Sequence, residues 1–239
     1  MKLIDLSIGY PQGKSSRVVM KGINAELHKG RLTCLIGANG AGKSTLLRTI
    51  SAFQPKLGGD IIIRGRKLES FSREELARLI GVVLTERPSV QHLTARQMVA
   101  MGRSPYTGFF GRLSDEDNAV VTESLRMVGI EHLAERMVHS LSDGERQKAM
   151  VAKALAQQTP VMLLDEPTAF LDYPSKVELM TLLRRLAEER RLTILVSTHD
   201  LEIALRTAHR LWILSDRGLC EGTPEEMKGE VERCFFVRS

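Results

Sequence analysis

Residues Thr33 to Arg48 read TCLIGANGAGKSTLLR, and they decide the fold of this chain. Within them, Gly37 to Ser44 fits the pattern G-x-x-x-x-G-K-[ST]. The apolar run from Leu32 to Ile36 is typical of a buried strand, and Thr45 to Arg48 can begin a helix. A strand, a glycine loop and a helix in this order bind phosphate, because successive N–H groups point at one anion and the helix N-terminus adds positive charge.

The residues of this loop have separate expected tasks. Lys43 can reach the β- and γ-phosphates of a nucleotide, and the hydroxyl of Ser44 can ligate Mg²⁺. The alternative is a glycine-rich turn before an ordinary helix, which would not need Lys-Ser in this register. The residues expected to surround the phosphates are Gly37, Asn39, Gly40, Ala41, Gly42, Lys43, Ser44 and Thr45.

Composition indicates an ordinary globular chain that acts at a membrane only through a partner. The 239 residues carry a net charge of +5 with 43% hydrophobic residues, which is compatible with an anionic membrane, a nucleotide or a nucleic acid. No run approaches the ~20 apolar residues that a transmembrane helix needs. Cys34, Cys220 and Cys234 show neither a disulfide framework nor metal-ligand spacing, and Cys34 is expected in the core.

Apolar runs alternate with helical patterns along most of the chain, which predicts an α/β fold with a parallel sheet covered on both faces. A turn-rich gap is expected at 9–16. The expected strands are 2–8, 18–27, 32–36, 60–64, 81–84, 161–165, 193–197 and 211–214. The expected helices are 72–79, 94–101, 114–128, 131–137, 142–157, 175–189 and 201–208, with a last short helix opening at 223–226.

The helical patterns between 87 and 158 predict an inserted helical subdomain in a single domain of 1–239. Segments 1–86 and 159–239 would then form the nucleotide-binding core, with a small antiparallel β subdomain near the N-terminus. Met162 to Glu166 is an apolar strand ending in two acids, which should project into the ligand crevice. Asp165 can hold Mg²⁺ through water, and Glu166 can orient or deprotonate an attacking water.

Three further positions have both a structural and a functional interpretation. Ser142 with Glu145 forms a capping box, and the same Gly144-containing helix start could bind phosphate. His199 lies just past an expected strand, where an imidazole could contact a γ-phosphate, although an isolated histidine is more often structural. Tyr10, placed in the turn after the first strand, could stack on a purine.

These motifs, in their order, resemble the nucleotide-binding subunits of ABC transporters along essentially the whole chain. The glycine loop resembles Walker A, Leu141 to Glu145 the Leu-Ser-Gly-Gly-Gln signature, and Val161 to Glu166 Walker B. Thr168 to Asp172 resembles the D-loop, while His199 and Tyr10 fall at the switch histidine and the adenine-stacking aromatic. The resemblance implies a RecA-like P-loop NTPase core, ATP and Mg²⁺ as cofactors, and Lys43, Glu166 and His199 as catalytic residues.

The resemblance also implies partners. Two copies would close head to tail around two ATP molecules, with Ser142, Gly144 and Glu145 serving the partner's nucleotide. Closure would drive a transmembrane permease, served indirectly by a substrate-binding protein, at the cytoplasmic face of the membrane, without nucleic acid. Gly102 to Tyr106 and Gly111 to Asp117 resemble importers of iron-siderophore complexes, haem and cobalamin, in which this lobe meets the permease.

The sequence departs from the family pattern at three positions. Thr85 stands where the family has its Q-loop glutamine, with Glu86 beside it, and an oxygen of either side chain could still reach a metal-bound water. Asp143 replaces a signature glycine, and Glu145 replaces its glutamine. Both acids favour a helix N-terminus by ~0.3–1 kcal/mol each, but they lie near a polyanion, so weaker ATP-bound closure is expected.

Two other classes of function remain to be weighed. ABC ATPases of DNA repair carry a long coiled coil between Walker A and the signature, and ABC translation factors carry two cassettes on one chain. Neither feature is present in this sequence. A small-molecule kinase would use the glycine loop without a signature helix, so the Ser142 region argues against it. Fold alone does not separate these three.

Overall fold

The computed structural model describes residues 1–12, 15–84, 92–108 and 111–236. Its strands are β1 (Lys2–Gln12), β2 (Ser15–Glu26), β3 (Leu32–Gly37), β4 (Gly58–Ile63), β5 (Arg66–Lys67), β6 (Ile80–Val83), β7 (Val161–Asp165), β8 (Thr193–Ser197), β9 (Arg210–Ser215) and β10 (Gly218–Gly222). Its α-helices are α1 (Lys43–Ile50), α2 (Arg73–Ala77), α3 (Ala95–Ala100), α4 (Asp115–Met127), α5 (Asp143–Ala156), α6 (Tyr173–Arg190), α7 (Leu201–Thr207) and α8 (Lys228–Val231). Short helical turns cover Leu68–Ser70, Met101–Arg103, Glu131–Leu133, Val138–Ser140 and Glu232–Phe236.

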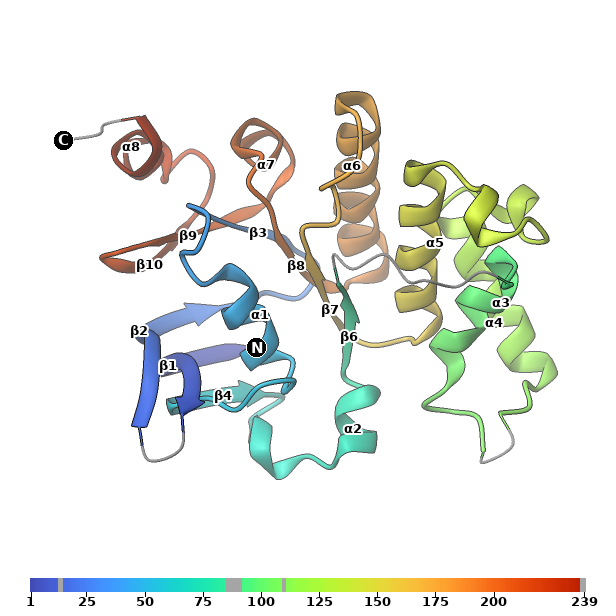
Figure 1. Ribbon diagram of the computed structural model, residues 1–239, viewed down its shortest axis with the longest axis horizontal. Helices are drawn as coiled ribbons and strands as arrows, with labels where there is room; N and C mark the ends of the chain where they lie inside the picture. The colour runs from blue at the N-terminus through green and yellow to red at the C-terminus, as the bar shows by residue number, and fades with distance from the viewer. Residues whose placement is uncertain (13–14, 85–91, 109–110, 237–239) are drawn as a thin grey trace.

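Within these residues the strands form a larger and a smaller sheet. The larger sheet has the order β10-β9-β3-β8-β7-β6, and the smaller has the order β2-β1-β4-β5. In the larger sheet all neighbours pair in parallel except β10, which pairs antiparallel with β9 at one edge. Figure 1 shows the smaller sheet beside the larger one, with α1 between them. The predicted α/β class, with a parallel sheet and a small antiparallel sheet, is therefore confirmed.

Both faces of the larger sheet are buried, which explains the nearly continuous apolar strands. Successive residues of one strand point to opposite faces. Cys34 and Leu164 accordingly belong to one hydrophobic cluster, while their neighbours Leu35 and Leu163 belong to the other. Burial raises the pKa of the Cys34 thiol to about 12, so this residue is a small core side chain, as expected.

Side-chain caps set the starts of four helices at the positions that the sequence indicates. Ser72, Thr94, Ser114 and Ser142 each accept a hydrogen bond from the backbone N–H three residues on, and the side chain at that later position reaches back to the cap. Each box satisfies two backbone N–H groups that the helix itself leaves unpaired. The start of α5, which carries the candidate signature, is therefore fixed by local sequence.

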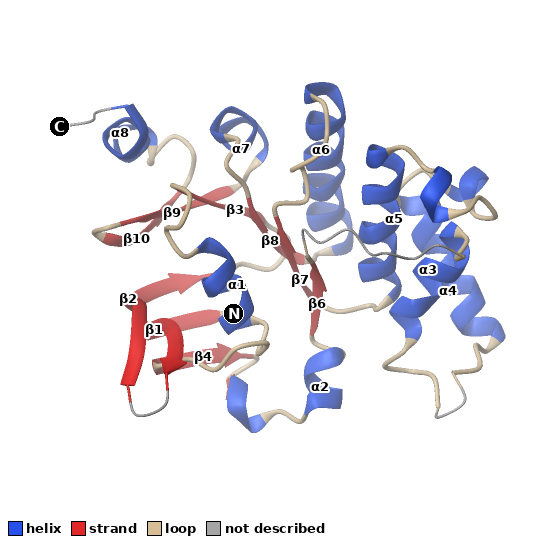
Figure 2. Cartoon of the chain, in the orientation of Figure 1, coloured by secondary structure: helices blue, strands red, loops and turns tan. Residues whose placement is uncertain are grey.

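Helices α3, α4 and α5 gather at one end of the larger sheet, apart from the smaller sheet (Figure 2). Arg103 and Asp117 tie this group together, because Nε of Arg103 donates to Oδ1 of Asp117 at 2.8 Å and both residues are buried. Arg103 also donates to the carbonyl of Ala156 at the end of α5. The division of the chain at 87–158 stays a prediction.

Three local predictions are wrong, and one strand was missed. The gap expected at 9–16 is largely the continuation of a long hairpin, in which Tyr10 of β1 pairs with Arg17 of β2. Segment 131–137 forms only a short turn, and the last helix begins at Lys228 rather than at 223–226. Strand β10 was missed because pairing with β9, not an apolar pattern, makes Gly218–Gly222 extended.

No helix in the described ranges combines the length and apolar character that a bilayer crossing requires.

Candidate nucleotide-binding site

The glycine loop between β3 and α1 needs its glycines for two separate physical reasons. Gly37 pairs in register with Leu214 of β9, and a Cβ at Gly37 would lie 2.6 Å from the Leu214 carbonyl oxygen. Gly40 and Gly42 have φ angles of 81° and 104°, in the left-handed region that glycine occupies without strain. The loop therefore adopts a bend that few other sequences allow.

Lys43 lies folded into this loop. Its ammonium group donates to the carbonyl oxygens of Gly37 at 2.8 Å and Ala38 at 3.2 Å, and the residue is only 6% exposed. A buried positive charge held by two carbonyl dipoles is only partly compensated, so an anion at the loop gains the attraction of the full ammonium charge. Ser44, in the first turn of α1, is exposed.

Asp165 and Glu166 meet the end of strand β8. Asp165 is in register with Ser197, whose hydroxyl donates to Oδ1 of Asp165 at 2.6 Å. The backbone N–H of Glu166 donates to the same hydroxyl oxygen at 2.9 Å and to the Ser197 carbonyl at 3.1 Å. One buried serine therefore holds both acidic residues, and the sequence analysis missed it although it lies two residues before His199.

Glu166 and His199 come together at this edge of the sheet. Nδ1 of His199 lies 3.6 Å from Oε2 of Glu166, and the two side chains are 51% and 28% exposed. Glu166 has a φ of 45°, an uncommon conformation for a residue with a side chain, which redirects the chain after β7. A carboxylate and an imidazole beside each other and open to solvent can orient water and share its proton.

The donors present at this site fit Mg²⁺ bound with a nucleotide. Mg²⁺ prefers oxygen ligands and is usually held by one or two carboxylates together with phosphate oxygens. Asp165 supplies a carboxylate that is only 8% exposed, and Ser44 supplies an exposed hydroxyl beyond the glycine loop. Thr85, the third predicted ligand, lies outside the described residues.

Tyr10 lies against the first turn of α1. Its hydroxyl is 2.9 Å from Oγ1 of Thr45, and the residue is 40% exposed. The structure therefore places Tyr10 in strand β1 rather than in a turn, and it brings Tyr10 to the helix that begins with Lys43. An exposed ring at this position can stack on a base whose phosphates occupy the loop.

The start of α5 stands apart from the glycine loop of its own chain, as Figure 1 shows for α5 and α1. Ser142 caps α5 and donates its N–H to the carboxylate of Glu145 at 2.8 Å. Asp143 pairs with Arg146 at 2.9 Å. A Cβ at Gly144 would lie 3.6 Å from Oγ of Ser175, so this position is not tightly packed. The predicted site residues thus form two separate groups within one chain. One group surrounds the glycine loop and the ends of β7 and β8, and the other lies at the start of α5.

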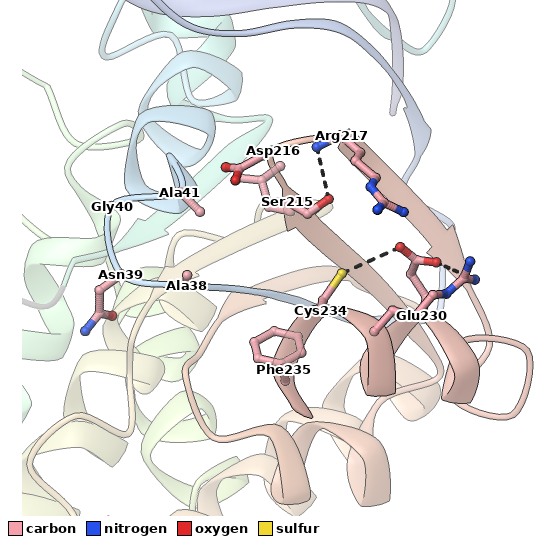
Figure 3. Close-up of a pocket in the computed structure, with 12 residues that line it drawn as sticks. Ala38, Asn39, Gly40, Ala41, Ser215, Asp216, Arg217, Glu230, Cys234 and Phe235 are labelled. Atoms are coloured by element: carbon pink, nitrogen blue, oxygen red, sulfur yellow. Dashed lines mark hydrogen bonds and ion pairs between the residues drawn. The ribbon is translucent and has the colours of Figure 1, made fainter. Parts of the chain in front are cut away.

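A cavity of about 660 Å³ flanks the outer side of the glycine loop (Figure 3). Residues 38–41 form one wall. Ser215–Arg217 at the end of β9 and Cys234–Phe235 near the C-terminal end form the others. The hydroxyl of Ser215 accepts from the N–H of Arg217 at 3.4 Å, and Cys234 donates to Glu230 at 3.6 Å. Sequence reasoning did not find these walls, because residues 210–235 reach the loop only through the pairing of β9 with β3.

Comparison with known proteins agrees with this geometry. The family model described as ABC transporter matches residues 20–169. An uncharacterised ABC transporter ATP-binding protein of Methanocaldococcus jannaschii, MJ0873, is 45% identical over 97% of this chain and 79% of its own length. The ferric enterobactin transport ATP-binding protein FepC of Escherichia coli is 38% identical over 98% of this chain and 86% of its own.

Solved structures show the same fold. A metal-chelate type ABC transporter in an inward-facing conformation superposes with a TM-score of 0.84 and 26% identity, covering 99% of this chain and 88% of the other. The cassette MJ0796, in a dimeric post-hydrolysis state with ADP and Pi, gives 0.78 and 29% identity over 93% of this chain and 98% of its own. The chain therefore belongs to the ABC transporter family, as an ATP-binding subunit with ATPase activity.

Proposed function

We propose that this chain powers an importer of iron-chelate complexes by closing head to tail with a second copy around two ATP molecules. One observation carries the dimeric arrangement. The capped start of α5 can bind phosphate, yet it stands apart from the glycine loop of its own chain (Figure 1). A second copy would bring the start of its α5 to this glycine loop. In return, the start of α5 of this chain would reach the glycine loop of the second copy. MJ0796, a relative in fold, is described as dimeric.

We assign the tasks within one site as follows. The loop amides of Gly40 to Lys43 and the Lys43 ammonium bind the phosphates, while Tyr10 stacks on the base. Ser44 and Asp165 hold Mg²⁺, which would neutralise charge on the phosphate oxygens. Glu166 orients the attacking water and accepts its proton, and His199 contacts the γ-phosphate. Ser142, Gly144 and Glu145 serve the nucleotide of the second copy.

The class of cargo is proposed from the relatives. FepC is named for ferric enterobactin transport, and the FhuC protein of Bacillus subtilis, 37% identical over 93% of this chain, for iron(3+)-hydroxamate import. The similar solved transporter is described as metal-chelate type. An iron-siderophore complex is therefore the favoured cargo, with haem and cobalamin as less directly supported members of the same class.

A groove on the side of the molecule supports contact with a permease. It has a volume of about 710 Å³ and lies between the end of α1, α2, β6, the Met101–Arg103 turn and α5. Phe53 and Met101 line it and are 64% and 48% exposed. Exposed large apolar side chains around a groove are typical of a protein interface. A short permease helix would fit here, between the core and α5, the helix that Ser142 caps.

The remaining parts of the proposal follow from this contact. Through the permease the chain would sit at the cytoplasmic face of the membrane, and a separate substrate-binding protein would deliver the cargo. No role for nucleic acid is proposed.

Co-purification tests the proposal. The tagged chain is recovered from the host's membranes in mild detergent, and a polytopic membrane protein that stimulates its ATPase is expected with it. Recovery alone, or with nucleic acid or ribosomes that survive a salt wash, would contradict the transporter assignment and favour an ABC ATPase of another class.

A further inference from the structure

A second cavity, of about 620 Å³, lies at the opposite end of the central strands from the glycine loop. Pro160 and Leu192, which precede β7 and β8, line it, whereas the glycine loop follows the last residue of β3. One face of α4 forms its other wall. This volume is within the range that small-molecule sites occupy, and nothing in the nucleotide chemistry above uses it.

The floor of this cavity is apolar. Leu155 is 7% exposed, and Val120, Met127 and Leu192 are half-buried around it. All four pack against or belong to the main hydrophobic cluster, so the floor is continuous with the core. An apolar body placed on this floor would remove further apolar surface from water.

The rim of the cavity carries cations that lack partners. Within the part of the chain that the structure describes, the side chains of Lys29, Arg64 and Arg191 form no hydrogen bond or ion pair, although all three line the cavity. Arg190 is different, because it pairs with Glu123 at 2.7 Å. Glu116 is the one unpaired carboxylate among the described lining residues, so the rim keeps an excess of positive charge next to an apolar floor.

The backbone at the rim is costly for the residues that it carries. Arg64, Gln158 and Arg191 have φ angles of 49°, 53° and 54°, and they are three of the six non-glycine residues with positive φ in the described ranges. Arg191 ends α6 in the left-handed conformation that glycine usually supplies. Glycine would relieve strain at these positions, and all three residues line the cavity. The side chain of Gln158 accepts a hydrogen bond from Arg103, so Arg64 and Arg191 are the two that carry a free cationic side chain on strained backbone at the rim.

We propose that this cavity binds an anionic amphiphile, a small molecule with a carboxylate or phosphate head on an apolar body. The head would pair with Lys29, Arg64 and Arg191, and the body would lie on Val120, Met127 and Leu155. Guanidinium groups suit this task, because they form paired hydrogen bonds with carboxylates and phosphates. A neutral amphiphile would leave the cations unpaired, and a cationic one would be repelled.

Two fluorescent probes test the charge requirement. Binding of 1-anilinonaphthalene-8-sulfonate is titrated with the nucleotide site saturated by ADP, beside the uncharged N-phenyl-1-naphthylamine. The double variant Arg64→Gly with Arg191→Gly should bind the sulfonate at least about tenfold more weakly, with little change for the uncharged probe. Glycine suits both backbone conformations, so this variant should keep its folding. Lys21→Gln with Arg112→Gly removes two exposed charges elsewhere and is the matched control.

Displacement then identifies the head group. Dodecanoate or dodecyl phosphate should displace the sulfonate probe, and whichever is more effective shows whether the cavity prefers a carboxylate or a phosphate. Dodecyltrimethylammonium should not displace it. Equal sulfonate binding by the double variant and the control overturns the proposal. So does failure of both anionic lipids to displace the probe, which would mark its binding as adventitious.

Discussion

The hydroxyl group of Ser197 lies 2.6 Å from Oδ1 of Asp165 and donates a hydrogen bond to it. The hydroxyl oxygen of Ser197 also accepts a hydrogen bond from the backbone N–H of Glu166 at 2.9 Å. Strands β7 and β8 place these residues opposite each other in register. Ser197 thus fixes the direction of the proposed metal ligand and the start of the strained backbone that carries the proposed base.

Replacing Ser197 with alanine should lower ATPase turnover by about 10- to 100-fold, because a positioning partner of a metal ligand is removed. The apparent affinity for Mg²⁺ should fall together with turnover. Steady-state rates measured over a range of Mg²⁺ concentrations check this. Ser124→Ala, at a buried serine whose hydroxyl donates only to the Val120 carbonyl, is the control. A Ser197 variant with normal Mg²⁺ dependence would show that the contact has no such role.

Replacing Glu166 with glutamine should preserve ATP binding and dimerisation but slow turnover by at least ~10²-fold. The amide keeps the shape of the side chain and cannot accept the proton of the attacking water. Single-turnover hydrolysis and size-exclusion chromatography with ATP measure the two properties separately. Turnover near that of the parent chain would remove Glu166 from the proposed role.

The acids at the signature should weaken ATP-bound closure to different degrees. Arg146 offsets the charge of Asp143 at 2.9 Å. The hydrogen bond from the N–H of Ser142 lowers the pKa of Glu145, so this carboxylate stays ionised at neutral pH. Glutamine at 145 can still accept that N–H, so the cap survives. Asp143→Gly with Glu145→Gln should therefore strengthen ATP-dependent dimerisation, with the larger share from position 145.

Arg146→Gln provides the opposite test of the same electrostatics. It removes the ion pair that Arg146 makes with Asp143, so ATP-dependent dimerisation should become weaker than in the parent chain. Sedimentation at several ATP concentrations measures each variant. Unchanged dimerisation in the double variant and in Arg146→Gln would show that these charges do not face the nucleotide.

Replacing Met101 with aspartate should uncouple the chain from its permease. Met101 is 48% exposed at the proposed groove, and a carboxylate there would have to be desolvated on docking. Basal ATPase activity should remain, while stimulation by the permease should fall by at least about tenfold. Met137, 43% exposed and outside the groove residues, supplies the matched control Met137→Asp. Equal loss in both variants would contradict the assignment of the groove.

The pair of Arg103 and Asp117 should make stability depend on acid pH. The N–H of Ser114, and then Arg103, lower the pKa of Asp117 from 3.8 to about 2. Because the pKa of Asp117 is lower in the folded than in the unfolded state, the ionised carboxylate stabilises the fold at pH values above the unfolded-state pKa. This stabilisation is lost as the pH falls through about 2. Asp117→Asn should lower Tm at pH 7 by at least about 5 °C, and the difference should shrink below pH 4. Thermal melts across this range check the prediction, which a constant difference would contradict.

The sequence by itself determined the local elements of this protein. The glycine loop, the acids at the end of β7 and the cap of α5 were predicted from adjacent residues, because each depends on a backbone bend or a hydrogen bond within a few positions. The α/β class followed for the same reason, since apolar runs of strand length report burial on both faces.

Tertiary structure decided what these elements meet. Ser197 holds Asp165 only because β8 pairs with β7, and β10 exists only because it pairs with β9. Tyr10 reaches Thr45 because β1 and β2 form a long hairpin. The turn-forming residues at 9–16 made the sequence analysis predict a gap there instead. The cavity rimmed by Lys29, Arg64 and Arg191 joins residues more than a hundred positions apart. The free energy of strand pairing depends on residues from strands that are far apart in the sequence, so a local sequence pattern does not predict which strands pair.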